Sequence, residues 1–339
     1  MHTHHHHCTC FIIPSSMLRK LADAAATDAE RQSLLDQAEH SAYLRGQRSV
    51  TPALMGISAG EKRRTIYNAR HGTTLPGKLV RGETDPAGHD LAVNQAYDGA
   101  GATYDFYLNV LNRNSVDGKG LRLDSTVHYD KKFNNAFWNG QQMVYGDGDG
   151  KLFLGFTGAV DVIAHELTHG VTQYTVPGGL VYRGQSGALN ESISDVFGSI
   201  VKQWTLRQSV DQADWLIGAG IMAPAVGKAL RSMAEPGNRA LTWSGDDQPG
   251  TMAGYQEDAD VHTSSGIPNH AFYIAATMLK GHAWEKAGPI WYRALSLLSS
   301  TATFAEAAQA TTQAAVMLYG ANSAEQQAVQ SAWKEVGVI

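Results

Sequence analysis

VDVIAHELTHGVT, residues 160–172, holds His165, Glu166 and His169 in an HExxH pattern, in a mostly apolar or small-residue stretch. On a helix, the four-residue step between the two histidines places both imidazoles on one face, about one turn apart. A single tetrahedral metal ion can bind both rings there. Glu166 lies beside that face, where its carboxylate can act on a metal-activated water. The stretch predicts a zinc site on a buried central helix.

Catalytic zinc uses three protein ligands and keeps one position open, so a third ligand must come from elsewhere in the chain. Our candidate is Glu191, inside the helical pattern 187–195. A bare HExxH also occurs as a solvated histidine pair on amphipathic helices. A buried Glu191 without a partner would be costly, and zinc supplies that partner.

Composition limits the possible classes. With 339 residues and 43% hydrophobic side chains, the chain can form two packed domains plus an appendage. The net charge of −5 offers no basic stripe, so nucleic acid is not an expected partner. We find no run of about 18 apolar residues and expect no membrane partner. Residues 11–13 are too short an apolar run for a signal peptide, which predicts a cytoplasmic precursor or non-classical export.

The extreme N-terminus is rich in metal-binding side chains. His2 and the run 4–7 are either a purification tag or a natural metal-binding tract. Cys8 and Cys10 are spaced poorly for a structural disulfide, and a further hypothesis brings one of them near zinc in the precursor.

Three regions of the chain differ in composition and in hydrophobic periodicity, and together they predict an α+β fold. Residues 1–50 are polar and helical, 51–158 are strand-rich, and 159–339 are dominated by helical periodicity. A strand-rich lobe followed by a helical lobe implies a site in the cleft between them. Strand-like runs lie at 64–67, 126–129 and 142–145. Beyond the HExxH helix, we expect helices over 17–43, 90–112, 188–205, 270–280, 288–299 and 303–318.

Four further segments, in order, resemble the thermolysin family of metallopeptidases over residues 64–339. They are NNAFWNG at 134–140, MVYGDGDG at 143–150, LRSM at 230–233 and VHTSSGIPN at 261–269. CFIIP at 10–14, followed by Met17 and Leu18, is similar to the propeptide of the short-propeptide, protealysin-like branch. The resemblance implies a two-lobed peptidase preceded by a short helical propeptide.

For the chemistry, the resemblance implies zinc on His165, His169 and Glu191, with Glu166 as the general base. Tyr182 and His262 would donate hydrogen bonds to the oxygen that becomes negative. A ligating imidazole needs an acceptor for its other N–H group, and the resemblance assigns Asp195 to His165 and Asn190 to His169.

For substrate binding, the resemblance implies that Asn135, the Ala136 carbonyl and Arg231 hold the substrate backbone. Apolar residues would line the pocket that receives the substrate side chain just after the scissile bond. The resemblance therefore implies that the enzyme cleaves before bulky apolar residues. The residues that would line the pocket are Phe153, Val162, Ile217 and Leu230.

One position departs from the family pattern. The family places an aspartate five residues before the catalytic histidine to orient it, and here that position is Glu257. Either this longer carboxylate reaches His262, or Asp258 or Asp260 substitutes for it.

We predict that calcium is not required. The turn with Asp147 and Asp149 could be a calcium loop, but a tight turn needs no ion. The family's paired-calcium carboxylates correspond to Asp161 and Lys202, so an ammonium replaces a carboxylate. Asp214 remains, but Leu216 and Ala219 stand where further carboxylates are expected. We expect Lys202 to pair with Asp161, with Asp214 as a candidate second partner. The alternative is a solvated Lys202 with no structural role.

The expected function is a zinc-dependent neutral endopeptidase made as a zymogen, monomeric, acting on proteins and peptides, with its own propeptide as intramolecular inhibitor. The propeptide would be cut within 44–52, by the enzyme at Ser49-Val50 or by an outside protease. The alternative is a non-catalytic zinc protein whose propeptide occupies the cleft permanently. A base at Glu166 favours the enzyme, because a structural site has no use for it.

Overall fold

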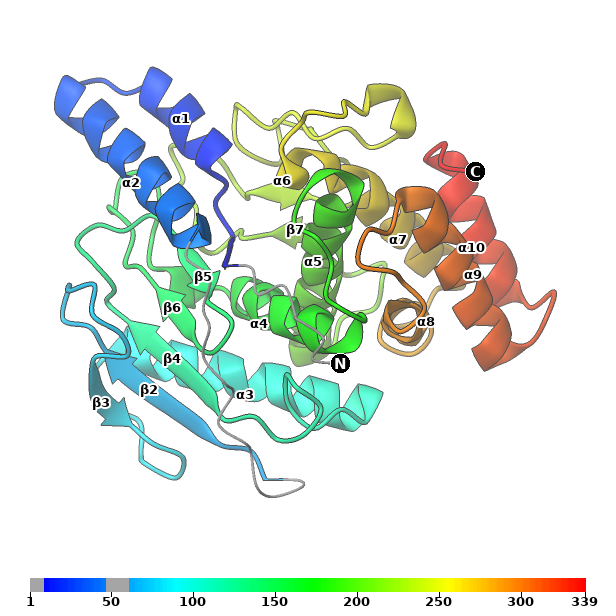
Figure 1. The fold of residues 1–339 in the computed structure, drawn as a ribbon, viewed down its shortest axis with the longest axis horizontal. Coiled ribbons are helices and arrows are strands. Elements are labelled where there is room, and N and C mark those ends of the chain that lie inside the picture. The colour runs from blue at the N-terminus through cyan, green and yellow to red at the C-terminus, as the bar shows by residue number, and fades with distance from the viewer. Residues whose placement is uncertain (1–8, 47–60) are drawn as a thin grey trace.

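The computed structural model describes residues 9–46 and 61–339, which form a helical hairpin and two lobes (Figure 1). The hairpin lies over the strand-rich lobe, and the helical lobe occupies the other half of the view. This is the α+β arrangement predicted from the sequence. The described part of the chain contains no helix long and apolar enough to cross a membrane.

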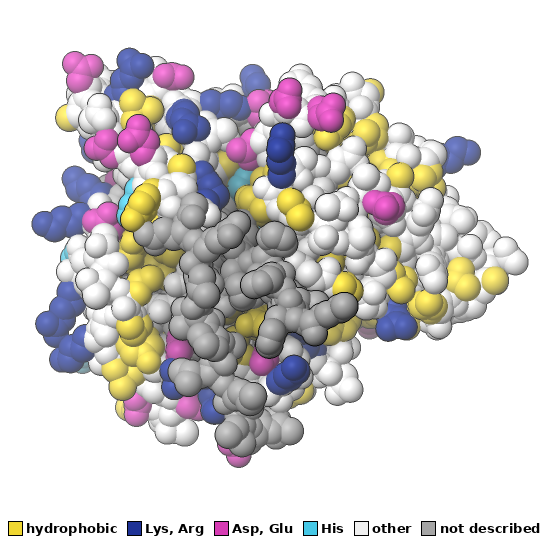
Figure 2. Space-filling model, viewed as in Figure 1, with side chains coloured by type: hydrophobic (Ala, Val, Ile, Leu, Met, Phe, Trp, Pro, Cys, Tyr) yellow, Lys and Arg dark blue, Asp and Glu magenta, His cyan; other side chains and the backbone are white. Residues whose placement is uncertain are grey.

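The N-terminal hairpin consists of α1 (Ser15–Asp23) and α2 (Asp28–Gly46). We expected one helical pattern over 17–43, and the structure divides it. The reason is Thr27, whose Oγ1 atom accepts a hydrogen bond from the backbone N–H of Glu30 at 3.2 Å, a typical start of a new helix. Acidic and basic side chains are interspersed over this hairpin in Figure 2, at the upper left.

A six-stranded sheet forms the first lobe in the described residues, in the order β1-β5-β6-β4-β2-β3. β6, β4 and β2 are parallel neighbours, and the outer pairs are antiparallel. The edge strand β1 comes from the N-terminal segment, so the chain itself covers this edge. The strands are β1 (Cys10–Phe11), β2 (Arg64–Asn68), β3 (Lys78–Arg81), β4 (Leu123–Val127), β5 (Ala136–Trp138) and β6 (Met143–Tyr145).

The helix expected over 90–112 is α3 (Leu91–Leu111), and its two flanking residues are its caps. The Asp90 carboxylate accepts from two backbone N–H groups of the first turn. Asn112 ends the helix with φ of 51°, a conformation that asparagine tolerates better than most residues. Local capping chemistry therefore fixes both ends of α3.

The second lobe is built around two buried helices, α4 (Val160–Thr175) and α5 (Gly184–Leu206). The HExxH pattern lies on α4, and Glu191 lies on α5. A two-stranded pair, β7 (Leu216–Ile217) and β8 (Arg231–Ser232), lies next to α5. The remaining helices are α6 (Val261–Ser264), α7 (Gly266–Leu279), α8 (Ala287–Leu295), α9 (Phe304–Tyr319) and α10 (Ala324–Glu335).

The sequence prediction omitted α6 and α10. Helix α6 has only four residues, too few for a periodic signal. Helix α10 is mostly polar, and it is held by a few buried residues such as Val329 and Trp333. The Trp333 indole donates to Thr311 Oγ1 of α9 at 2.8 Å, so tertiary contacts support this helix.

The Gly-Asp turn at 146–150 is held by its own side chains. Asp149 Oδ1 accepts from the backbone N–H groups of Lys151 and Leu152 at 2.8 and 2.7 Å, and Oδ2 accepts from Asn134. Asp147 binds His128. The carboxylates of this turn are therefore engaged by protein donors.

Candidate active site

Three side chains in the described residues converge on one point between α4 and α5. His165 and His169 approach each other with their Nε2 atoms 3.1 Å apart. The Glu191 oxygens lie 3.4 and 3.5 Å from these two nitrogens. All three side chains are buried, and their possible ligand atoms lie within 4.8 Å of one another. A buried His2Glu set of this kind fits a tetrahedral metal with an open position.

The hydrogen bonds of the His165 and His169 rings show which nitrogen atoms are free to bind a cation. His165 Nδ1 lies 2.8 Å from Asp195 Oδ1, and His169 Nδ1 lies 2.8 Å from Asn190 Oδ1. Both partner atoms are acceptors, so each Nδ1 carries the proton. With a metal ion bound, each ring would be neutral and would present the lone pair of Nε2 to the same small space. Two facing lone pairs beside a carboxylate are stabilised by a cation, and a zinc ion fits.

The charge state of the ligands follows from their surroundings. Burial lowers the pKa of His169 to about 4, so this ring is neutral. Burial also acts against the charged form of His165, but hydrogen bonds to Asp195 and Glu191 raise its pKa to about 9. A metal ion at His165 Nε2 would take the place of that proton. Burial opposes ionisation of Glu191 too, but the charge of His262 and the imidazoles of the two neighbouring histidines lower its pKa to about 2.

Gly198 on α5 allows the two ligand-bearing helices to approach closely. A Cβ atom at this position would lie 2.6 Å from the backbone oxygen of Asp161 on α4. Any larger residue would push α5 away and move Glu191, which lies on the same helix, from the histidines.

Glu166 lies beside the metal group at the end of β5. Its Oε2 atom accepts from the backbone N–H of Trp138 at 3.0 Å, and Oε1 has no hydrogen bond among the described residues. Burial raises the pKa of Glu166 well above its usual value, against the lowering effect of His165. A carboxyl group with a raised pKa is suited to taking up and returning a proton near neutral pH.

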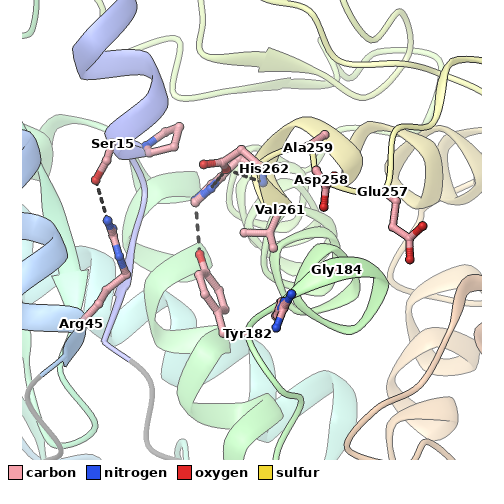
Figure 3. A pocket seen from close by; sticks show the side chains of 12 residues that line it. Ser15, Arg45, Tyr182, Gly184, Glu257, Asp258, Ala259, Val261 and His262 are labelled. Atoms are coloured by element: carbon pink, nitrogen blue, oxygen red, sulfur yellow. Dashed lines mark hydrogen bonds and ion pairs between the residues drawn. The ribbon is translucent and has the colours of Figure 1, made fainter.

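His262 and Tyr182 lie on the other side of the same space (Figure 3). Tyr182 Oη lies 3.4 Å from His262 Nε2 and donates a hydrogen bond to Glu191. The structure places Asp260 next to His262, with Oδ1 2.8 Å from Nδ1, while Glu257 lies away from the ring in Figure 3. Of the three carboxylates considered for this role, Asp260 is therefore the partner of the ring, and Glu257, the position that the family pattern indicated, is not.

The reason is local. Asp260 is the N-cap of α6, so one carboxylate oxygen binds both the backbone N–H and the ring of His262. Burial alone would raise the pKa of Asp260, but the hydrogen bond and charge of His262 hold it below its usual range. Burial would lower the pKa of His262, yet Glu191 and Asp260 raise it.

Arg231 and Asp195 form a buried bidentate pair behind the metal group. Arg231 Nε and Nη2 lie 2.9 and 2.8 Å from the two Asp195 oxygens. Burial alone would raise the pKa of Asp195, but Arg231 and His165 lower it below its usual range. Sequence reasoning missed Asn269, which donates to Asp195 at 2.8 Å, and Ser194, 3.1 Å from His169 Nδ1. Asn269 lies in the quoted segment 261–269, which could have indicated it.

The N-terminal segment passes directly over this site. β1 pairs with β5 in the register Phe11 to Phe137. Asn135 binds both the backbone N–H and the carbonyl of Ile13, at 3.0 and 2.9 Å, and the Ala136 carbonyl accepts from Ile12 N. The residues expected to hold a substrate backbone thus hold the chain's own backbone.

The four apolar residues expected after the scissile bond are all buried. They share one hydrophobic core with Ile12, and they come from three different parts of the chain. They are Phe153, Val162 on α4, Ile217 on β7 and Leu230.

Lys202 on α5 lies between two carboxylates at the far end of the α4–α5 contact. Its Nζ atom is 3.2 Å from Asp161 Oδ2 and 2.7 Å from Asp214 Oδ1, and it donates to the carbonyl of Leu216. Burial would lower the pKa of Lys202, but these carboxylates raise it. Ala219 lies in the same loop and offers no ligand side chain.

The metal group in the described residues does not include Cys10, which is buried in β1. Cys8, the histidine tract and the expected cleavage region 47–52 lie outside the described residues.

Two family models together match most of the chain after residue 52. The catalytic domain of thermolysin metallopeptidase matches residues 53–173, and the alpha-helical domain of thermolysin metallopeptidase matches residues 178–338. The chain belongs to the thermolysin family of metallopeptidases, which are hydrolases.

Two particular relatives match this chain over nearly their whole length, and a third over half of its length. An extracellular metalloprotease of Pectobacterium carotovorum subsp. carotovorum is 46% identical over 339 residues, 97% of this chain and 96% of that protein. The solved precursor of protealysin, a metalloproteinase from Serratia proteamaculans, superposes with a TM-score of 0.85 at 46% identity. The match covers 97% of this chain and 100% of that one. A thermolysin of Alicyclobacillus acidocaldarius subsp. acidocaldarius is 44% identical over 283 residues, and the match spans 50% of its length.

Proposed function

We propose that this metallopeptidase is a zinc-dependent neutral endopeptidase, made as a zymogen, that cuts before bulky apolar residues. The observation that carries the proposal is a buried His2Glu metal group with the buried carboxyl of Glu166 beside it. A purely structural metal site has no use for a general base in that place. Zinc, when bound, acidifies water and polarises the substrate carbonyl.

The chain's own residues supply the other steps. Glu166 takes a proton from the attacking water and returns it to the leaving amine, for which its raised pKa is suited. His262 and Tyr182 donate hydrogen bonds to the carbonyl oxygen as it becomes negative. Asp260 positions the His262 ring through Nδ1 and leaves Nε2 directed at that oxygen.

Substrate orientation and specificity follow from the neighbouring groups. Asn135 and the Ala136 carbonyl fix the backbone register, and Arg231 binds the carbonyl that follows the cut. The apolar wall of Phe153, Val162, Ile217 and Leu230 favours a large apolar side chain there, because burial of that side chain contributes about 1.5–3 kcal/mol.

Residues 1–50 are proposed as an intramolecular inhibitor that is removed by a cut within 44–52. Supporting this, segment 10–13 occupies the groups that would hold a substrate. The match to a solved protealysin precursor along its whole length also supports a precursor form.

Casein hydrolysis by the zinc-loaded chain, before and after nicking within 44–52, tests this function. The nicked wild type should be active, and a nicked Glu166→Ala control should be slower by about 10²–10⁴-fold. Peptides with Leu or Phe after the scissile bond should be cut faster than those with Asp. No hydrolysis by either chain would instead indicate a non-catalytic zinc protein, and equal hydrolysis by both would mean that Glu166 is not the general base.

A further inference from the structure

The Phe11-Ile12 peptide bond lies at the point where the catalytic groups meet. The carbonyl oxygen of Phe11 is 2.9 Å from His262 Nε2. The backbone N–H of Ile12 donates to the Ala136 carbonyl at 3.2 Å, on β5, and the N–H of Trp138 on the same strand donates to Glu166 at 3.0 Å. The Phe11 carbonyl oxygen therefore faces His262, a proposed oxyanion donor, and the Ile12 nitrogen lies along the strand that binds Glu166, the proposed proton donor.

The residues after this bond are clamped in a single direction. Arg231 Nη1 lies 3.4 Å from the carbonyl of Ile12, and Asn135 binds both backbone groups of Ile13. A shift by one residue would reverse these donors and acceptors. The side chain of Ile12 is fully buried in the core that includes Leu230. A bulky apolar residue thus follows the bond, as the proposed specificity requires.

We propose that the prosegment is bound as a substrate and that Phe11-Ile12 is a bond this peptidase hydrolyses. This inference rests on the proposed peptidase function. Water adds to the Phe11 carbonyl carbon and passes a proton to Glu166. The C–N bond then breaks, Phe11 becomes a carboxylate, and the nitrogen of Ile12 leaves as an amine after receiving the proton. No further reactant is needed.

Arg45, in the last turn of α2, holds both sides of this bond. Its Nη2 atom lies 2.5 Å from Ser15 Oγ, as Figure 3 shows. Its guanidinium lies 5.4 Å from the centre of the Phe11 ring. In the intact precursor, the two new ends would stay side by side at a high effective concentration, which favours re-joining. The uncut precursor therefore stays latent even though its inhibitor is a substrate.

A cut within 44–52 separates the hairpin from the catalytic lobes, close to Arg45. Hydrolysis at Phe11-Ile12 then divides the freed prosegment into two pieces. Neither piece retains all the contacts on both sides of the active site, so both dissociate and the inhibitor does not rebind. Cleavage at this bond makes activation irreversible.

The experiment uses the zinc-loaded full chain, nicked within 44–52 and followed by mass spectrometry. We expect a fragment that ends at Phe11 and one that begins at Ile12, in wild type and in Ile12→Leu. Both should be absent in Ile12→Asp, which places a charge in the apolar pocket. Nicked wild type that hydrolyses casein but releases an uncut prosegment would overturn the inference, whereas no casein hydrolysis would contradict the proposed function instead.

A second measurement follows release of the prosegment rather than its fragments. In nicked Glu166→Ala the bond stays intact, so gel filtration should show the prosegment retained on the order of tenfold longer than in nicked wild type. Equal retention would contradict the inference. Arg45→Gln should allow loss of cut pieces from the precursor without nicking, and a precursor that keeps them would show that Arg45 does not hold the two ends.

Discussion

Helices α4 and α5 meet at two polar clusters that balance buried acidic groups in different ways. At one, His165, His169 and Glu191 present ligand atoms to a common space. At the other, the Lys202 ammonium lies between Asp161 and Asp214. The first cluster is completed by a metal ion from solution, whereas the second contains its own cation.

The difference shows what each cluster can do. A metal with an open position can activate water, but it can also be removed by a chelator. An ammonium has no open coordination position and cannot be lost, so it can only stabilise. The Lys202 side chain is 11% exposed and that of Asp161 is 2% exposed, whereas Asp214 is 48% exposed. The Asp161 pair should therefore account for most of the effect.

The largest expected effect separates metal binding from chemistry at the first cluster. His169→Ala should lose both zinc and activity, because two ligands hold the ion poorly. Glu166→Ala should keep zinc and lose about 10²–10⁴-fold in kcat. Metal analysis should use chains without residues 1–50, since the histidine tract binds metal itself. A zinc-free Glu166→Ala chain would mean that Glu166 is a ligand.

The second effect concerns Lys202. Lys202→Met should lower the free energy of unfolding by about 3–5 kcal/mol, because it leaves the buried Asp161 without its counter-charge. Urea unfolding measures this change. Lys20→Met, which breaks the exposed pair with Asp247, is the matched control and should cost about 1 kcal/mol or less. A similar small loss for both variants would show that Lys202 is effectively solvated.

The two clusters also differ in how far the sequence could predict them. The two histidines follow helical spacing, which is local, and Glu191 was chosen because it lies in a second helical pattern where zinc would give a buried carboxylate its partner. The partner of His262 could not be chosen among three carboxylates, because the answer depends on Asp260 acting as the cap of a four-residue helix. The break between α1 and α2 likewise depends on one hydroxyl, that of Thr27.

A third cluster, on the strand-rich lobe, contains a histidine whose positive charge depends on pH. His128 lies between Asp147 and Asp90, with nitrogen–oxygen distances of 2.8 and 3.0 Å, and His71 lies 3.5 Å from Asp147. The hydrogen bond to Asp147, against the effect of burial, raises the pKa of His128 to about 9. Its contribution to stability is therefore fully present below about pH 6.5 and is lost as the pH rises through 9.

Because this site is partly exposed, the expected loss between pH 7 and 9.5 is about 1 kcal/mol. Urea unfolding of wild type and His128→Gln at both pH values measures it. The variant should lose less stability than wild type over this interval. Parallel losses in the two chains would show that another group titrates.

The smallest expected effect is the response to calcium, which should be absent. After all metals are removed with a chelator and zinc alone is restored, millimolar calcium should change neither the melting temperature nor peptide hydrolysis. Any site with a dissociation constant 100-fold below the calcium concentration would add about 2.7 kcal/mol, which is easily detected. A gain of that size in wild type would show that a calcium site survives and that Lys202 does not replace one.

Lys202→Glu makes this comparison sharper. Three carboxylates would then face one another where one ammonium had balanced two, so the variant should be less stable than wild type without added ions. Oxygen ligands of this kind suit calcium, and millimolar calcium should recover part of the loss in this variant only. A destabilised variant that ignores calcium would mean that the positions of Leu216 and Ala219, and not the ammonium alone, prevent binding.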